Sequence, residues 1–190
     1  APTHQYEIKK IEKKLFDSRV KYIFNEDKKG LAFSRNLAIS LSSGKYFTFK
    51  DDDDKWETGF LLEMLSAMNV GSTLPMVAVA GYINKYTENS YCYFKRRLTM
   101  YDCFIEGYTP PVGSQFYSLE LIKAAGSYNA VKSGVDHDLW VNIVSERPDA
   151  IVSFIPKSLV TPDAFLSSNN EKMTTNFSKR TKGISESLII

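Results

Sequence analysis

The sequence predicts an α/β fold, in which helices cross between the strands of a sheet. Segments with helical spacing and segments with strand-like apolar runs alternate along the chain, which is the pattern of strands connected by crossover helices. At 190 residues, with 43% hydrophobic and 24% charged residues, the chain has the size and composition of one globular domain. Four adjacent acids, Asp51 to Asp54, directly follow one predicted strand, and open α/β sheets bind ligands at the carboxyl ends of strands.

The first half of the chain contains three predicted helices and three predicted strands. Leu37, Ala38 and Leu41 are spaced as on one face of a helix, which we expect over 31–41, and the polar sequence over 42–44 ends it. Nearer the start of the chain, apolar residues at helical spacing among lysines predict an amphipathic surface helix over 6–16. In chain order we expect a helix over 6–16, a strand over 20–24, a helix over 31–41, a strand over 45–50, a helix over 57–68 and a strand over 75–83.

The second half opens with a segment of poor periodicity, 82–108, which carries six tyrosines and the basic cluster Lys95, Arg96 and Arg97. The helix predicted to begin at 136 has acids in its first turn, where the helix dipole favours them. In chain order we expect a strand over 114–117, a helix over 119–125, a turn over 126–129, a helix over 136–144 and a strand over 151–155.

The end of the chain differs in composition from the rest. Beyond Thr161 the sequence becomes polar, which favours a loop or mobile arm over packed structure. We therefore expect a domain over 1–162 and a polar arm or lid over 163–190.

Charge and cysteine content exclude several function classes. The formal net charge of +2 arises from 24 basic and 22 acidic residues, so no global field favours nucleic acid as a partner. Cys92 and Cys103 have neither metal-binding nor redox spacing, which favours a reducing compartment. No apolar run approaches the ~20 residues of a membrane-spanning helix.

The acidic run predicts a site for a metal ion and phosphate. Adjacent carboxylates repel one another, so they need either full solvation or a cation, and oxygen ligands favour Mg²⁺ or Mn²⁺. The apolar residues Phe47 and Phe49 before the run and Trp56 after it make a solvated surface run the weaker interpretation. A calcium loop is excluded because its sixth position, which requires glycine, is Trp56. An expression-tag protease site is excluded because tags lie at termini.

Five segments in series carry a resemblance to a known family. The first three are Lys29-Gly30-Leu31-Ala32-Phe33-Ser34-Arg35-Asn36, Gly44-Lys45-Tyr46-Phe47 and Asp51-Asp52-Asp53-Asp54-Lys55-Trp56. The other two are Gly113-Ser114-Gln115-Phe116-Tyr117, which leads on to Tyr128, and Gly134-Val135-Asp136-His137-Asp138-Leu139-Trp140. In this order they closely resemble the family-2 glycosyltransferases of GT-A fold, over about residues 5–162. The expected architecture is therefore a GT-A, Rossmann-like mixed sheet flanked by helices.

Three departures from the family pattern accompany this resemblance. The family opens with two strands that hold the nucleotide base and ribose, and the chain starts after them, so we expect an amino-terminally shortened form of the domain. Many members place a metal-binding His after the last strand, where this chain offers only Asp163, so the third metal ligand stays open. Val135 replaces the usual Glu beside the expected base.

The resemblance implies roles for the acids and for the Arg-Asn pair. Asp53 would hold Mn²⁺ or Mg²⁺, with Asp51 nearer the ribose and Asp52 also on the nucleotide-sugar side. Arg35 and Asn36 would serve the donor phosphates near a helix start. The alternative for this pair is a surface arginine followed by a capping or turn-forming asparagine.

On the acceptor side the resemblance implies that Asp136 is the catalytic base for the acceptor hydroxyl. Asp138 is the alternative base, although helical spacing turns it about 200° away from Asp136. Lys95, Arg96, Arg97, Tyr117 and Trp140 are expected on the acceptor or phosphate side. A solvated surface remains the alternative for the basic cluster, and His137 is interpreted as an exposed helix residue. For Trp56 and Trp140 a core position is favoured over a sugar platform.

The function that the resemblance implies is inverting, divalent-metal-dependent hexosyl transfer in the synthesis of bacterial capsule or lipopolysaccharide. The donor would be a nucleotide-diphosphate sugar, a UDP-sugar above all, and the acceptor a glycan or lipid-linked glycan. The expected location is cytoplasmic, with contact at the inner face of the membrane and homo-oligomerisation left open. Two alternatives are a non-catalytic nucleotide- or carbohydrate-binding remnant and a phosphoryl or nucleotidyl transferase, which would need carboxylates paired for two ions.

Overall fold

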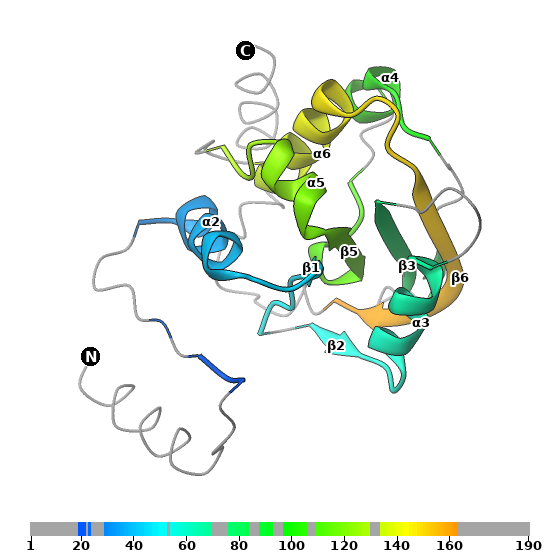
Figure 1. Ribbon diagram of the computed structural model, residues 1–190. Helices are drawn as coiled ribbons and strands as arrows, with labels where there is room; N and C mark the ends of the chain where they lie inside the picture. Colours follow the sequence, from blue (N-terminus) through cyan, green and yellow to red (C-terminus); the bar gives the residue numbers. More distant parts are fainter. Residues whose placement is uncertain are drawn as a thin grey trace, which may run out of the picture.

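The computed structural model describes residues 19–21, 23, 29–52, 54–69, 76–83, 88–92, 97–105, 109–129 and 134–162. Their elements are, in order, α2 (Leu31–Leu41), β1 (Tyr46–Thr48), β2 (Lys55–Trp56), α3 (Phe60–Ala67), β3 (Val77–Ile83), β4 (Ser90–Tyr91), α4 (Met100–Phe104), the 3₁₀ turn η1 (Val112–Ser114), β5 (Gln115–Ser118), α5 (Leu119–Ala124), α6 (Val135–Glu146) and β6 (Val152–Thr161). The strands form one sheet of order β1-β5-β3-β6-β2, with β4 paired to β3 (Figure 1). The predicted α/β fold is confirmed.

The central strand β3 separates two apolar clusters, one on each face of the sheet. Val77 and Val79 join the larger cluster, to which α2, α5 and α6 contribute. Ala78 and Ala80 join the smaller cluster, to which α3 contributes. Figure 1 shows α2, α5 and α6 grouped together and α3 apart from them. Side chains alternate across a strand, so this run of small and β-branched residues lets helices pack on both faces.

The sheet is mixed, with both parallel and antiparallel pairs. Within the described residues only β3 and β6 pair in parallel, whereas the pairs β1–β5, β3–β5, β3–β4 and β2–β6 are antiparallel. Crossover connection between parallel neighbours therefore accounts for one pair, and the predicted mixed sheet flanked by helices is confirmed. Short strands such as β1 and β2 complete the sheet from its ends.

The predicted elements differ from the observed ones mainly in length. The helix at Leu31–Leu41 has the predicted bounds, whereas the last strand was expected to end at 155 and continues to Thr161. It continues because its pairing with β3 resumes after two register shifts and reaches Tyr82↔Val160, and because Val160 and Thr161 also pair with β2. The sequence did not predict β2, β4 or α4, which contain only two to five residues.

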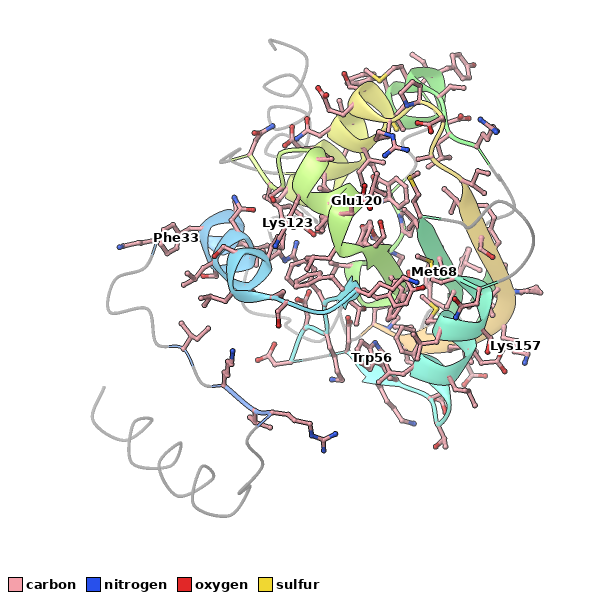
Figure 2. All side chains as sticks on the ribbon, in the orientation of Figure 1. Phe33, Trp56, Met68, Glu120, Lys123 and Lys157 are labelled. Atoms are coloured by element: carbon pink, nitrogen blue, oxygen red, sulfur yellow. The ribbon has the colours of Figure 1, made fainter. Side chains whose placement is uncertain are left out.

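The buried face of α2 differs from the predicted one. The described structure buries Ala32, Arg35 and Ile39, which follow one another at spacings of four or less along one helix face. Leu41, expected on the apolar face, is 49% exposed. Figure 2 shows Phe33, on the outer side of α2, pointing away from the sheet. A charged residue therefore occupies the centre of the face that packs on the domain.

Several expectations concern parts of the chain outside the described residues. The helix over 6–16 and the arm over 163–190 lie there, as do residues 22 and 24 of the strand expected over 20–24. Among the helices that the structure describes, none combines the length and apolar character needed to cross a membrane.

Gly81 marks the register shift between β3 and β6, and we predict that the Gly81→Ala substitution destabilises the domain. A Cβ atom there would lie 2.9 Å from the carbonyl oxygen of Lys157 and 3.0 Å from that of Tyr91, both backbone atoms that cannot rotate away. We expect the free energy of unfolding in urea to fall by about 1–3 kcal/mol. Gly44→Ala is the matched control, because its nearest neighbour would be 3.4 Å away. Equal stabilities of the two variants would contradict the packing described for β3.

Candidate active site

The acidic run forms a turn between β1 and β2, which lie at the two ends of the strand order. The backbone N–H of Asp54 donates to the carbonyl oxygen of Asp51 at 3.1 Å and closes the turn. The ammonium group of Lys50 donates to the carbonyl oxygen of Asp54 at 2.5 Å. The acids therefore follow the carboxyl end of β1, as the sequence predicts, although β1 pairs in antiparallel fashion with β5.

Gly113 of η1 fixes the downstream end of this turn. A Cβ atom at Gly113 would lie 2.0 Å from Oδ2 of Asp54, so the carboxylate packs directly against the glycine backbone. The indole N–H of Trp56 donates to the carbonyl oxygen of Gly113 at 2.9 Å, and the Trp56 ring stacks on Phe60 with centroids 4.3 Å apart. Trp56 thus belongs to the packing between β2 and α3, as the sequence analysis favoured.

Arg35 connects the acidic turn to α6. Its Nη1 donates to Oδ1 of Asp136, and its Nη2 donates to Oδ1 of Asp51 at 3.5 Å. The side chain of Arg35 is only 5% exposed, whereas those of Asp51 and Asp136 are 44% and 30% exposed. One buried cation therefore holds two partly exposed carboxylates from segments that are far apart in the sequence.

Two aromatic rings form a corner around the guanidinium group. The central carbon of Arg35 lies 5.2 Å from the ring centroid of Phe49 and 5.3 Å from that of Tyr128. The two rings meet edge to face with centroids 5.7 Å apart. Cation–π attraction stabilises the buried charge more strongly than it would a hydrated one. Phe49 and Tyr128 are site residues that the sequence analysis did not assign, although Tyr128 ends the segment quoted for the resemblance.

Asn36 holds the turn that carries Tyr128. Its side-chain amide donates to the carbonyl oxygen of Tyr128 at 2.7 Å, and its Oδ1 accepts from the backbone N–H of Tyr128 at 2.9 Å. The Asn36 amide thus donates to and accepts from the same backbone residue, as a paired strand would, and it ties the turn to α2. Arg35 and Asn36, adjacent in sequence, therefore position α6 and the Tyr128 turn respectively.

Asp136 lies in the first turn of α6, after Gly134, whose φ of +78° favours glycine. Asp138, two positions on, is fully buried and accepts from the backbone N–H of Asn129 at 3.3 Å. The two carboxylates point to different surroundings, as helical spacing predicts. His137 is 5% exposed and its Nε2 donates to the carbonyl oxygen of Cys103 at 2.8 Å, so the prediction of an exposed histidine is wrong.

Burial dominates the electrostatics of Asp136. Burial raises the pKa of its carboxyl group, the positive charge and hydrogen bond of Arg35 lower it, and the negative charge of Asp51 raises it. The net result is a raised pKa. The pKa of Tyr128 is also raised, chiefly by burial and by the charge of Asp136. A carboxylate with a raised pKa, partly open to solvent and fixed by a buried cation, is suited to accept a proton.

With this geometry in place, comparison with known proteins identifies the family. The family model described as glycosyl transferase family 2 matches residues 5–122. This chain belongs to glycosyl transferase family 2. The matched range includes the acidic turn, the Arg-Asn pair and the strands β1, β3 and β5.

Three curated relatives share shorter stretches with this family-2 chain. An Escherichia coli protein named UDP-Glc:alpha-D-GlcNAc-diphosphoundecaprenol beta-1,3-glucosyltransferase is 42% identical over 52 residues, which are 27% of this chain and 21% of the relative. A Bacillus subtilis (strain 168) protein, named as a glycosyltransferase of teichuronic acid biosynthesis, is 36% identical over 52 residues, again 27% and 21% of the two chains. An Escherichia coli (strain K12) protein, named as a glycosyl transferase of colanic acid biosynthesis, is 48% identical over 42 residues, 22% of this chain and 15% of the relative. The chain thus spans about a fifth or less of the length of these relatives.

The family-2 domain brings together four of the residues expected at the site. Arg35, Asp51 and Asp136 form one cluster, and Asn36 lies beside it on α2. Asp52 is exposed in the acidic turn. The position of Arg35 near the middle of α2, rather than near its first turn, differs from the expectation of a phosphate site at a helix start.

The acceptor-side expectations have mixed outcomes. Tyr117 and Trp140 are fully buried, and Oε1 of Gln115 accepts from the Tyr117 hydroxyl and, at 3.1 Å, from the Trp140 indole N–H. Their expected contact with an acceptor is therefore corrected to a role in the core. Arg97 is exposed before α4, and its acceptor role stays a prediction. Asp53, Lys95 and Arg96 lie outside the described residues.

The expected metal ligand is not among the described residues. Among the residues that the structure does describe, no group of three or more His, Cys, Asp or Glu side chains is arranged to hold a metal ion. The expected ligand Asp53 belongs to the remaining residues. The described neighbours still fit a hard cation, because the carboxylates of Asp51 and Asp52 keep exposed oxygen atoms at the turn.

We predict that Asn36→Ala lowers the stability of the domain without altering the affinity of the folded protein for UDP and Mn²⁺. The substitution removes both bonds to the Tyr128 backbone and leaves partly buried groups without their partner. We expect a loss of about 1–3 kcal/mol in the free energy of unfolding, measured in urea. Ser40→Ala serves as the control, because it removes an exposed bond to the preceding turn of the same helix. Unchanged stability with weaker UDP binding would instead support the nucleotide-side role expected for Asn36.

Proposed function

We propose that this chain is the catalytic part of an inverting, divalent-metal-dependent glycosyltransferase that acts in the synthesis of a bacterial surface polysaccharide such as capsule or lipopolysaccharide. The observation that supports this proposal is the cluster in which Arg35 joins Asp51, at the acidic turn, to Asp136, in the first turn of α6. Donor-side acids and a candidate base are thereby held at one place, as direct displacement between two substrates requires.

Asp136 is the group that we assign to the acceptor. One oxygen, Oδ1, is bonded to Arg35, and we assign Oδ2 to the proton of the acceptor hydroxyl. As that proton moves to Oδ2, the hydroxyl oxygen forms a bond to the anomeric carbon of the donor sugar. The bond from this carbon to the diphosphate oxygen breaks, the diphosphate leaves with the electron pair, and the anomeric carbon is inverted.

The acidic turn is the group that we assign to the donor. Asp53 would hold Mn²⁺ or Mg²⁺, with Asp51 and Asp52 beside it on the nucleotide-sugar side. When bound, such a cation would neutralise the charge of the leaving diphosphate. The packing of Asp54 against Gly113 fixes the end of the turn, so that the exposed carboxylates of Asp51 and Asp52 keep their direction.

The names of the relatives support the substrates that we propose. One relative is named for transfer from UDP-Glc to a GlcNAc-diphospholipid, and two are named for the biosynthesis of bacterial polysaccharides. We therefore propose a UDP-sugar donor and a glycan or lipid-linked glycan acceptor, encountered on the cytoplasmic side of the membrane. The exposed Arg97 next to α4, with Lys95 and Arg96 before it, would face the acceptor phosphate.

We predict that Asp136→Asn abolishes most sugar transfer and leaves donor binding intact. The amide keeps the shape and a bond to Arg35 but cannot take a proton, so kcat should fall by about 10²–10⁴-fold. The measurement is UDP release from UDP-glucose with a GlcNAc-diphospholipid acceptor, alongside calorimetric binding of UDP with Mn²⁺. Glu63→Gln is the control, because Glu63 is a carboxylate of α3 that pairs with the exposed Lys157.

The pH dependence gives a second check on the same residue. A base works in its ionised form, so the raised pKa of Asp136 predicts that kcat/KM rises with pH through a value above the ordinary carboxylate pKa of 3.8. Near-normal transfer by Asp136→Asn, or loss of transfer in Asp138→Asn at unchanged stability, would move the base away from Asp136.

We predict that Asp53→Asn removes the Mn²⁺ dependence of UDP binding while the thermal unfolding midpoint without ligand stays unchanged. The acidic turn would lose the carboxylate assigned to the cation, and UDP would lose its bridge to the protein. Calorimetry of UDP with and without Mn²⁺ measures the effect, and Asp52→Asn is the neighbouring control, expected to weaken but not abolish the dependence. Retention of full Mn²⁺ dependence in Asp53→Asn would place the cation elsewhere.

A further inference from the structure

Arg35 is the group whose position departs most from its expected role. It was expected to meet the donor phosphates, yet the structure buries it behind two aromatic rings. We propose that Arg35 is a positioning residue, which orients the Asp136 carboxylate for the acceptor and does not bind the donor phosphates. This proposal rests on the proposed function, because it assigns Arg35 to the same base.

The first argument is access. Only 5% of the Arg35 side chain is exposed, and its two terminal nitrogens are each engaged by a carboxylate, of Asp136 and of Asp51. A phosphate ligand needs free donors that face the ligand, as Arg forks do when they bind phosphate in bidentate geometry. Arg35 instead directs both ends of its fork at protein carboxylates.

The second argument is rigidity. A guanidinium group packed into the corner of Phe49 and Tyr128 has few accessible rotamers. Asn36, the next residue, fixes the backbone of Tyr128 through two hydrogen bonds. The helix α2 therefore supplies the cation and also holds one of the rings that confine it. A charge confined in this way can fix the direction of a partly exposed carboxylate such as Asp136.

The third argument concerns the charges that face Asp136. Arg35 approaches from α2, Asp51 from the acidic turn and Tyr128 from the turn after α5. On α6 itself, His137 is bonded to Cys103, and Asp138 is bonded to the backbone of Asn129. Among the described residues Arg35 is thus the one cation that acts on Asp136. Without it, burial and the negative charge of Asp51 would act on the carboxylate unopposed.

The test is a double-substitution cycle in the full chain. Arg35→Met removes the fork, Arg35→Lys keeps the charge without bidentate geometry, and each is combined with Asp136→Asn. We expect Arg35→Met to lower kcat by no more than Asp136→Asn does, and the double variant to be no slower than Asp136→Asn alone, because the two residues act as one unit. Arg35→Lys should recover part of kcat. Arg147→Met is the matched control, since Arg147 pairs with an exposed carboxylate away from the site.

Donor binding separates positioning from phosphate recognition. The probe is UDP with Mn²⁺, and we expect its Kd to be the same in wild type, Arg35→Lys and Arg35→Met. A phosphate ligand would lose a charge-assisted hydrogen bond on substitution, which would weaken UDP binding by about tenfold or more. That outcome, with kcat preserved at saturating donor, would overturn the proposal.

A second measurement does not depend on sugar transfer. It tests the proposal even if Arg35→Met folds poorly or if the chain transfers no sugar. Carbon-13 NMR of the Asp136 carboxyl group reports its titration directly. We expect the pKa of Asp136 to be higher in Arg35→Lys than in wild type, because a lysine in the same corner holds the carboxylate less closely. An unchanged titration would overturn the positioning role, whereas wild-type-like transfer by Asp136→Asn would overturn the proposed function and leave the titration result standing.

Discussion

A single buried guanidinium group holds the site of this domain together. Arg35 is covered on α2 and contacts one carboxylate from the acidic turn and one from α6. The two ion pairs contribute differently to stability. In the pair with Asp51 the charged atoms are 3.5 Å apart and 44% of the Asp51 side chain is exposed. Screening by solvent therefore limits the contribution of this pair to about 1 kcal/mol at most. The pair with Asp136 therefore carries most of the compensation for burying the charge, and removing either partner would leave an unmatched ion in a poorly solvated place.

The surrounding packing makes this arrangement possible. Phe49 follows β1 directly and Tyr128 follows α5, so the aromatic corner forms only when the sheet and the helices on one face are assembled. The network around Gln115 then attaches α6 to β5 through Trp140, which sets the distance between the sheet and the helix that carries Asp136. The geometry of the site is accordingly a property of the tertiary fold, although its residues come in short local motifs.

Much of this could be predicted from the sequence, and the errors have a common cause. The bounds of α2, the acidic turn after β1 and the acids in the first turn of α6 follow from local pattern alone. The buried face of α2 does not follow from local pattern. Leu37, Ala38 and Leu41 suggest one apolar face, whereas the face that is buried contains Arg35. A buried arginine is tolerated only with partners supplied by distant segments, and local periodicity contains no information about them. The same reason applies to β2, two residues long, whose partner lies a hundred residues away.

The edge position of β2, beside the end of β6, has a consequence for the motion of the acidic turn. The strand β6 is paired with β3 as far as Val160, whereas the two residues of β2 that follow the acids are paired, among the described residues, with Val160 and Thr161 alone. Local opening of a protein involves the segments with the fewest buried bonds, and its free energy can lie far below that of global unfolding. The two-residue strand β2, at the edge of the sheet, is such a segment, so it can separate from β6 while β6, β3 and the helices stay folded. The acidic turn would then become mobile at the end that leads into β2, while the end that follows β1 would stay fixed. A turn proposed to bind the donor would therefore have one fixed and one mobile end.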